Sequence, residues 1–130
     1  MANSGEILFV SRETPDDETR RLFENRGFQL TAISDFAMAS NSISQARFSA
    51  IVVDVRVGSD AINLIRFVRQ HEQAKTLPLL AIGEWGTGEP TLALSAGADG
   101  FEPTPLLAER LATSIERLLI KRGLAAGAND

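Results

Sequence analysis

Asp54 is the residue of this chain with the clearest potential for chemistry, because it directly follows the apolar run Ala50–Val53. An unbroken apolar run rich in β-branched residues is typical of a strand buried on both faces, as in the middle of a parallel sheet. Open α/β sheets place their functional sites at the carboxyl ends of such strands. A carboxylate there is costly unless a cation pairs with it. We therefore predict that Asp54 is either a reactive carboxylate or half of an ion pair.

A candidate partner for Asp54 is Arg12, which follows the first predicted strand, residues 6–11. The carboxyl ends of neighbouring parallel strands lie at one edge of the sheet, so the two side chains can meet there. A guanidinium fits a carboxylate bidentately, and such a pair would depress the pKa of Asp54. We predict an ion pair between Arg12 and Asp54; the alternative is an arginine that is solvated in its loop.

Other residues that support catalysis or ligand binding are scarce. The glycine-rich segment 83–88 lacks the Gly-Lys-Ser/Thr of a phosphate-binding P-loop, and no Gly-x-Gly-x-x-Gly follows the first strand. His71 is the only histidine and there is no cysteine, so we expect no metal centre built on these residues and no disulfide. We predict no enzymatic activity. Trp85 is either packed over the sheet edge or exposed as an anchor for a partner.

Composition is that of an ordinary single-domain globular protein. The chain has 130 residues, of which 44% are hydrophobic and 23% charged. Its net charge of −4 argues against direct nucleic-acid binding. No apolar run approaches the length of a membrane span, and we find no signal peptide. We therefore expect a cytoplasmic protein without membrane association.

Strand and helix signals alternate along the chain. Strands are expected over residues 6–11, 28–33, 50–55, 79–82 and 100–102. Helices are expected over 14–26 with Thr14 as cap, over 36–47 with Ser34 or Asp35 as cap, after a cap at Asp60, from Pro90, and from Pro105 to about residue 122.

This alternation predicts an α/β fold with helices on both faces of a parallel sheet. We expect a three-layer, doubly wound, flavodoxin-like domain over residues 1–123, with five strands in the order 2-1-3-4-5. Residues 124–130 are expected to be a tail or the start of a linker. The predicted core includes Ile7, Phe9, Ile51, Val53, Leu80 and Ile82.

Four segments of the chain are landmarks of a known family: Ile51-Val52-Val53-Asp54, Leu77-Pro78-Leu79-Leu80-Ala81-Ile82, Ala96-Gly97-Ala98-Asp99-Gly100-Phe101 and Thr104-Pro105-Leu106. They resemble those of response-regulator receiver domains, the fold of the chemotaxis regulator. The resemblance covers roughly residues 6–122 and implies a module of two-component, phosphorelay signal transduction. It also implies that Asp54 matches the aspartate that accepts a phosphoryl group.

The resemblance fails at most of the site that surrounds this aspartate. The family has a pair of carboxylates after the first strand that help to bind magnesium; here Ser11 and Arg12 stand there, with Glu13 next to them. The hydroxyl residue after the fourth strand is replaced by Gly83, and the lysine before the last proline by Thr104. The switch aromatic is retained as Phe101. We therefore expect a degenerate receiver site that holds magnesium at most weakly, with no dedicated cofactor.

The leading interpretation is an atypical receiver, or pseudo-receiver, that acts through contacts with a histidine kinase, an output domain or a second copy of itself. One alternative is a functional phospho-acceptor, a phosphoprotein modified at Asp54 with weak magnesium dependence; another is a flavodoxin-like small-ligand binder. The family's usual contact surface predicts weak homodimerisation through the fourth helix, fifth strand and fifth helix. That face would carry Thr91, Leu92, Ser95, Phe101, Glu109, Arg110 and Arg117.

Overall fold

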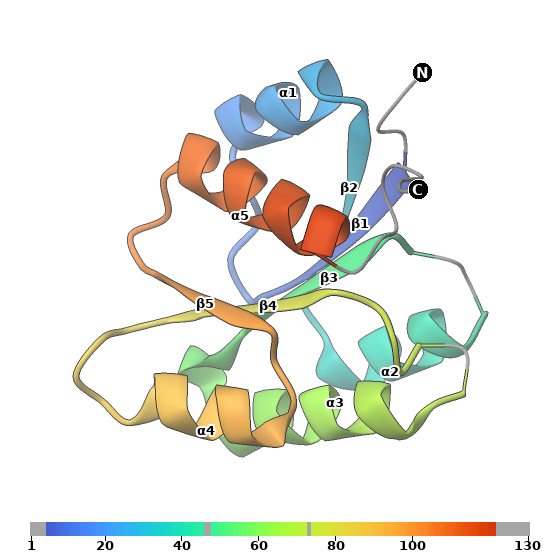
Figure 1. Ribbon diagram of the computed structural model, residues 1–130, viewed down its shortest axis with the longest axis vertical. Coiled ribbons are helices and arrows are strands. Elements are labelled where there is room, and N and C mark those ends of the chain that lie inside the picture. Colours follow the sequence, from blue (N-terminus) through green and yellow to red (C-terminus); the bar gives the residue numbers. More distant parts are fainter. Residues whose placement is uncertain (1–4, 46–47, 73, 122–130) are drawn as a thin grey trace.

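Five parallel strands form one sheet in the order β2-β1-β3-β4-β5 (Figure 1). The computed structural model describes residues 5–45, 48–72 and 74–121, and the predicted tail 124–130 lies outside them. The predicted sheet order and fold class are confirmed. The strands are β1 (Gly5–Val10), β2 (Phe28–Ile33), β3 (Ala50–Asp54), β4 (Leu79–Gly83) and β5 (Gly100–Pro103).

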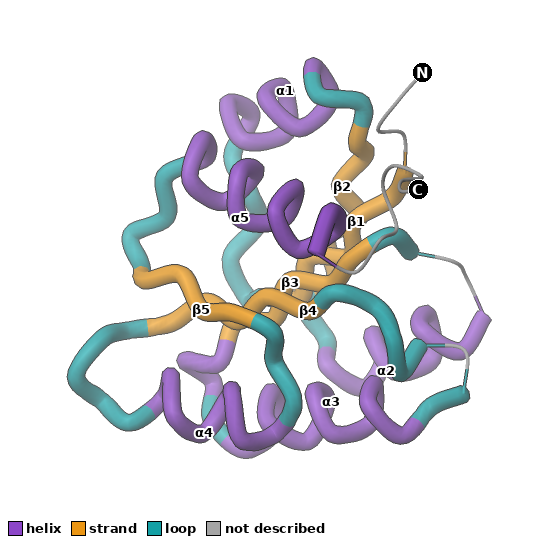
Figure 2. Tube along the Cα trace, in the orientation of Figure 1, coloured by secondary structure: helices purple, strands orange, loops and turns teal. Residues whose placement is uncertain are grey.

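Helices cover both faces of the sheet, as the alternation of elements requires. One face carries α1 (Asp17–Asn25) and α5 (Ala108–Lys121); the other carries α2 (Phe36–Gln45), α3 (Ser59–Gln70) and α4 (Glu89–Ala96) (Figure 2). A single 3₁₀ turn, η1 (Val55–Val57), follows β3 directly. Among the described residues, no helix has both the length and the apolar character that crossing a bilayer requires.

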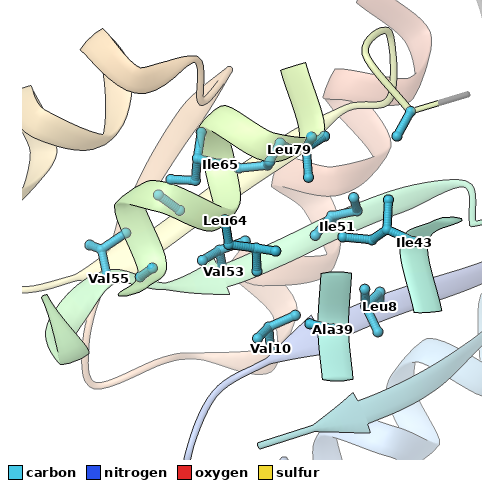
Figure 3. Close-up of a cluster of buried hydrophobic side chains, with 14 of the residues drawn as sticks. Leu8, Val10, Ala39, Ile43, Ile51, Val53, Val55, Leu64, Ile65 and Leu79 are labelled. Atoms are coloured by element: carbon cyan, nitrogen blue, oxygen red, sulfur yellow. The ribbon is translucent and has the colours of Figure 1, made fainter. Parts of the chain in front are cut away.

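The hydrophobic core is split by the sheet into two clusters, because successive residues of a strand point to opposite faces. In β3, Ile51 and Val53 pack against α2 and α3 (Figure 3), while Ala50 and Val52 pack toward α1 and α5. The predicted core is confirmed, since each of its members is at most 3% exposed: Ile7, Phe9, Ile51, Val53, Leu80 and Ile82.

Helix starts differ from the prediction where two capping residues compete. Thr14 does not cap α1; Asp16 is the N-cap, and its carboxylate accepts the backbone N–H of Thr19 at 2.9 Å. An aspartate is at least as good a cap as a threonine, and its charge also favours the positive end of the helix. At α2, Ser34 and Asp35 are the two predicted caps. Asp35 is the one that accepts the N–H groups of Ala37 and Met38.

Asp60 does not cap α3, contrary to the prediction. The N-cap is Gly58, with φ of 91°, and Asp60 lies inside the first turn. The turn η1 includes Val55, which the sequence pattern assigns to the third strand, and α3 begins at Ser59, one residue before the predicted cap. This shift matters for the site, because η1 contains Arg56, which lies two residues after Asp54.

Candidate functional site

Asp54 is the last residue of β3, the central strand, and only 2% of its surface is exposed. β3 is hydrogen-bonded to β1 on one side and to β4 on the other; Asp54 is opposite Ile82 of β4, while the pairing with β1 ends one residue earlier, at Val53. An ionised carboxylate that is so buried needs several hydrogen bonds to offset its lost hydration. Together, Asp54 and Ser11 are the buried polar residues of the described chain.

Arg56 supplies most of these hydrogen bonds. Its Nε donates to Oδ1 of Asp54 at 3.0 Å, and its Nη2 donates to Oδ2 at 2.7 Å. The backbone N–H of Arg56 also donates to Oδ1, at 3.0 Å, so Asp54 caps the 3₁₀ turn that carries its own partner. The guanidinium thus binds the carboxylate in the bidentate geometry that gives the strongest ion pairs.

Ser11 and Glu13 complete the site from the loop after β1. The hydroxyl of Ser11 donates to Oδ2 of Asp54 at 2.8 Å and accepts the backbone N–H of Glu13 at 3.0 Å. Oε1 of Glu13 lies 3.2 Å from Nη2 of Arg56, the same nitrogen that binds Asp54. Because the Glu13 side chain is 77% exposed, water screens this outer contact. Arg56 therefore occupies the space between the two carboxylates.

These contacts keep Asp54 ionised. Burial alone would raise the pKa of Asp54, but the hydrogen bonds from the side chain and backbone of Arg56 and from Ser11 outweigh it, and the pKa lies below its ordinary value. The pKa of Arg56 is raised, chiefly by its side-chain hydrogen bond to Asp54. At neutral pH the two groups therefore form a fully charged pair.

The predicted ion pair between Arg12 and Asp54 is wrong, because Arg56 and Ser11 already satisfy both carboxylate oxygens. Arg12 is exposed and instead lines a surface hollow of about 520 Å³ beside α2 and α3, together with Asp35 and Asp60. A sequence signal for the true partner exists in the spacing Asp-x-Arg, since a tight turn returns residue i+2 to the side chain of residue i.

Of the remaining predicted site residues, Gly83 ends β4, Phe101 lies within β5 and Thr104 directly follows β5. The N–H and hydroxyl of Thr104 donate to the carbonyl of Gly83 at 2.7 and 3.2 Å. Phe101 is half-buried and packs edge-on against Trp85, with ring centroids 5.1 Å apart. Trp85 nevertheless remains 64% exposed, so it packs over the sheet edge on one side only, and its role as an anchor for a partner stays a prediction. Glu89, which sequence reasoning missed, lies against Gly83.

The fold, with an acid at the carboxyl end of its central strand, is that of one structural class. A five-stranded parallel sheet of order 2-1-3-4-5, with an aspartate ending β3 and an aromatic residue in β5, is the architecture that the sequence landmarks predicted. This chain has the fold of a response-regulator receiver domain, and solved structures of that class resemble it closely.

Three of these structures illustrate the likeness. The signal receiver domain of a histidine kinase from Syntrophus aciditrophicus has a TM-score of 0.80 and 24% identity, covering 98% of each chain. The receiver domain of a sensor histidine kinase from Pseudomonas aeruginosa, solved with a magnesium ion in its active-site cleft, has a TM-score of 0.76 and 24% identity, covering 90% of this chain and 98% of that one. The chemotaxis response regulator CheY4 of Vibrio cholerae has a TM-score of 0.75 and 22% identity, covering 90% and 100%.

A curated relative is Protein PetR of Rhodobacter capsulatus, which is 35% identical over 109 residues. The match covers 80% of this chain and 45% of PetR, so the chain spans about half the length of that relative. No family model matches the chain.

The residues around Asp54 do not fit the magnesium ion that the fold family implies. Magnesium prefers an octahedral shell of oxygen ligands, usually with one or two carboxylates. Here the two nearby carboxylates, Asp54 and Glu13, both contact the guanidinium of Arg56. Within the described part of the chain, no three acidic, histidine or cysteine residues are grouped to hold a metal.

Proposed function

We propose that this chain is an atypical receiver domain of two-component signal transduction that acts through protein contacts and is not switched by magnesium-dependent phosphorylation of Asp54. The observation that carries this proposal is the bidentate ion pair, in which Arg56 occupies both oxygens of Asp54. Receiver-fold structures that belong to histidine kinases support a phosphorelay context. We place the protein in the cytoplasm, where its kinase or output partner would lie.

The ion pair opposes phosphorylation in two ways. Phosphoryl transfer is catalysed mainly by positioning and by neutralising charge on the transferred group, for which such sites use a metal ion. In this chain the neutralising cation is Arg56, and it is bonded to the nucleophile itself. In addition, Asp54 is 2% exposed, so an incoming phosphodonor would have to displace Arg56 before either oxygen could attack phosphorus.

Magnesium with beryllofluoride, a phosphoryl mimic, is expected to leave the backbone amide resonances of residues 50–56 in the parent protein unchanged, because Arg56 already binds Asp54. A variant that restores the acids and removes the competing cation, Ser11→Asp with Arg12→Asp and Arg56→Met, is expected to show saturable, magnesium-dependent shifts. Arg12→Asp alone is the control, since Arg12 does not contact Asp54. Saturable shifts centred on Asp54 in the parent would instead identify a functional phospho-acceptor.

The proposed contact surface is the face formed by α4, β5 and α5. Leu92 of α4 is 56% exposed. Trp85, in the loop before α4, packs against Phe101 of β5 and is 64% exposed. Both are large apolar side chains of the kind that anchor protein interfaces. Charges on the face are partly paired already: Arg110 lies 3.4 Å from Glu102, and Glu109 lies 3.1 Å from Arg26. We therefore propose that the apolar residues supply most of the affinity for a kinase, an output domain or a second copy, while the charges set orientation.

Trp85→Ala is expected to weaken self-association or partner binding through this face by about tenfold or more, as for other exposed aromatic anchors. Sedimentation velocity over a range of concentrations measures the self-association. Met38→Ala is the matched control, because Met38 is 60% exposed but lies on α2. Equal effects of the two substitutions would exclude this face as the contact surface.

A further inference from the structure

The space beside Gly83 is filled by three side chains from three different elements. A Cβ built on Gly83 would lie 2.6 Å from Oε1 of Glu89, 2.9 Å from Cγ2 of Val55 and 3.3 Å from the ring of Phe101. Real Cβ atoms are essentially never found under 3.0 Å from such neighbours. Glu89, at the start of α4, thus occupies the space that the side chain of any residue other than glycine would need at position 83.

Hydrogen bonds fix Glu89 in this position. Its Oε1 accepts the backbone N–H of Glu84 at 2.9 Å, which closes the turn between β4 and α4. Thr87 strengthens the same turn: its hydroxyl donates to the carbonyl of Glu84 at 3.0 Å and accepts the N–H of Glu89 at 3.2 Å. The carbonyl of Gly83 is held from the other side by both donors of Thr104.

The filled space lies between the Asp54 site and the exposed aromatic face. Val55 directly follows Asp54 and is 2% exposed, with its side chain against Gly83. Phe101 touches the same space and packs against Trp85 on the outer side. Packed side chains couple two sites when they have two discrete arrangements, and here Glu89 already fills the space that Val55 and Phe101 border.

We propose that Glu89 replaces the absent side chain of Gly83 and holds the β4–α4 turn, Phe101 and Trp85 in a single arrangement that does not respond to the state of Asp54. This inference deepens the proposed function and rests on it: an unswitched receiver would present one fixed contact surface to its partner. Glu89 is in this sense a positioning residue for Trp85.

Amide hydrogen exchange at Glu84 tests the hydrogen bond that holds the turn. Glu89→Ala removes the acceptor, and exchange at the Glu84 N–H is expected to become about fivefold faster. Glu89→Gln retains an oxygen acceptor at the same chain length and is expected to exchange like the parent. The indole N–H resonance of Trp85 is expected to shift or broaden in Glu89→Ala only. Unchanged exchange in Glu89→Ala would overturn the proposal.

A double-mutant cycle tests whether Glu89 fills the space at Gly83. Gly83→Ala is expected to lower the denaturant midpoint of the parent, because the new methyl group must displace both Glu89 and Val55. In the Glu89→Ala background the same change is expected to lower the midpoint by less, because the contact with Glu89 is gone while those with Val55 and Phe101 remain. Equal losses in the two backgrounds would contradict the proposal. If Gly83→Ala does not fold in the parent but folds with Glu89→Ala, the cycle supports the proposal.

The failure of this inference is distinguishable from the failure of the proposed function. Magnesium and beryllofluoride acting on Asp54 in the parent would overturn the proposed function. If the Trp85 indole resonance then stayed in place, the holding role of Glu89 would be supported, and if it moved with the Asp54 resonances, that role would be refuted as well.

Discussion

Arg56→Ala is expected to lower the free energy of unfolding by about 2–4 kcal/mol at neutral pH, because it leaves a buried carboxylate without its cation. Asp54 would keep the hydroxyl of Ser11 as a donor and lose the two side-chain hydrogen bonds of the guanidinium. This expected loss of stability is smaller than the full cost of a buried unpaired charge. The Arg56 side chain is 29% exposed, so water can enter the space that the guanidinium vacates. Equilibrium denaturation in urea measures the difference.

Two further variants separate the ion pair from a general effect of losing charge. Arg12→Ala is the matched control: it removes an exposed arginine from the adjoining loop and is expected to change stability by less than about 0.5 kcal/mol. Asp54→Asn is expected to cost less than Arg56→Ala, because a neutral amide tolerates burial and the freed Arg56 can still contact Glu13 and water. If Arg12→Ala and Arg56→Ala were equally harmful, the assignment of Arg56 as partner would be wrong.

The same ion pair determines how stability responds to acid. The pKa of Asp54 is lowered in the folded protein, so its contribution to stability is complete above the unfolded-state value of about 3.9 and is lost as pH falls through the folded pKa. In Arg56→Ala, burial without the cation raises the pKa of Asp54, and protonation relieves the unpaired charge. The deficit of this variant relative to the parent is therefore expected to shrink from neutral pH toward pH about 4. A constant deficit in urea titrations across this range would show that charge is not the cause.

Arg69→Ala is expected to have a still larger effect, about 3–5 kcal/mol, because one side chain joins α3 to the segment before β4 and to the segment between α4 and β5. Nε of Arg69 donates to the carbonyl of Gly97 at 2.7 Å, and Nη1 donates to that of Leu77 at 2.8 Å. Nη2 pairs with Asp99 at 2.8 Å, and Asp99 also accepts the N–H of Leu79. The side chains of this pair are each only 18% exposed, so Arg69→Ala removes a donor from two carbonyls and the cation beside a largely buried carboxylate.

Arg66→Ala provides the control for this prediction, since Arg66 is an exposed cation one turn away on α3. It is expected to be close to neutral, within about 0.5 kcal/mol. Arg69→Lys is expected to recover only part of the loss, because an ammonium group cannot reach several acceptors as a planar guanidinium does. Similar midpoints for Arg66→Ala and Arg69→Ala would rule out Arg69 as a structural link.

Strand order, fold class and the position of Asp54 follow from the local sequence. Strands that are buried on both faces must be apolar throughout. Segments such as Ile51–Val53 and Leu79–Ile82 can therefore be recognised as strands from the sequence. Regular alternation of such strands with helices leaves few right-handed arrangements, and the receiver order is one of them. The place of Asp54 at the sheet edge follows because an apolar run ends at its first charged residue.

The partner of Asp54 and the filling of the space at Gly83 depend on the three-dimensional path of the loops. Arg12 and Arg56 are both cations near the same sheet edge, and only the 3₁₀ turn after β3 brings one of them onto the carboxylate. Glu89 is distant from Asp54 in sequence and reaches Gly83 because α4 starts where the turn closes. Loop conformation carries no periodic pattern, since each turn is set by a few local hydrogen bonds and by the packing of its neighbours. The strand sequences therefore predict which residues lie at the sheet edge. Which loop residues contact one another there is determined only by the tertiary structure.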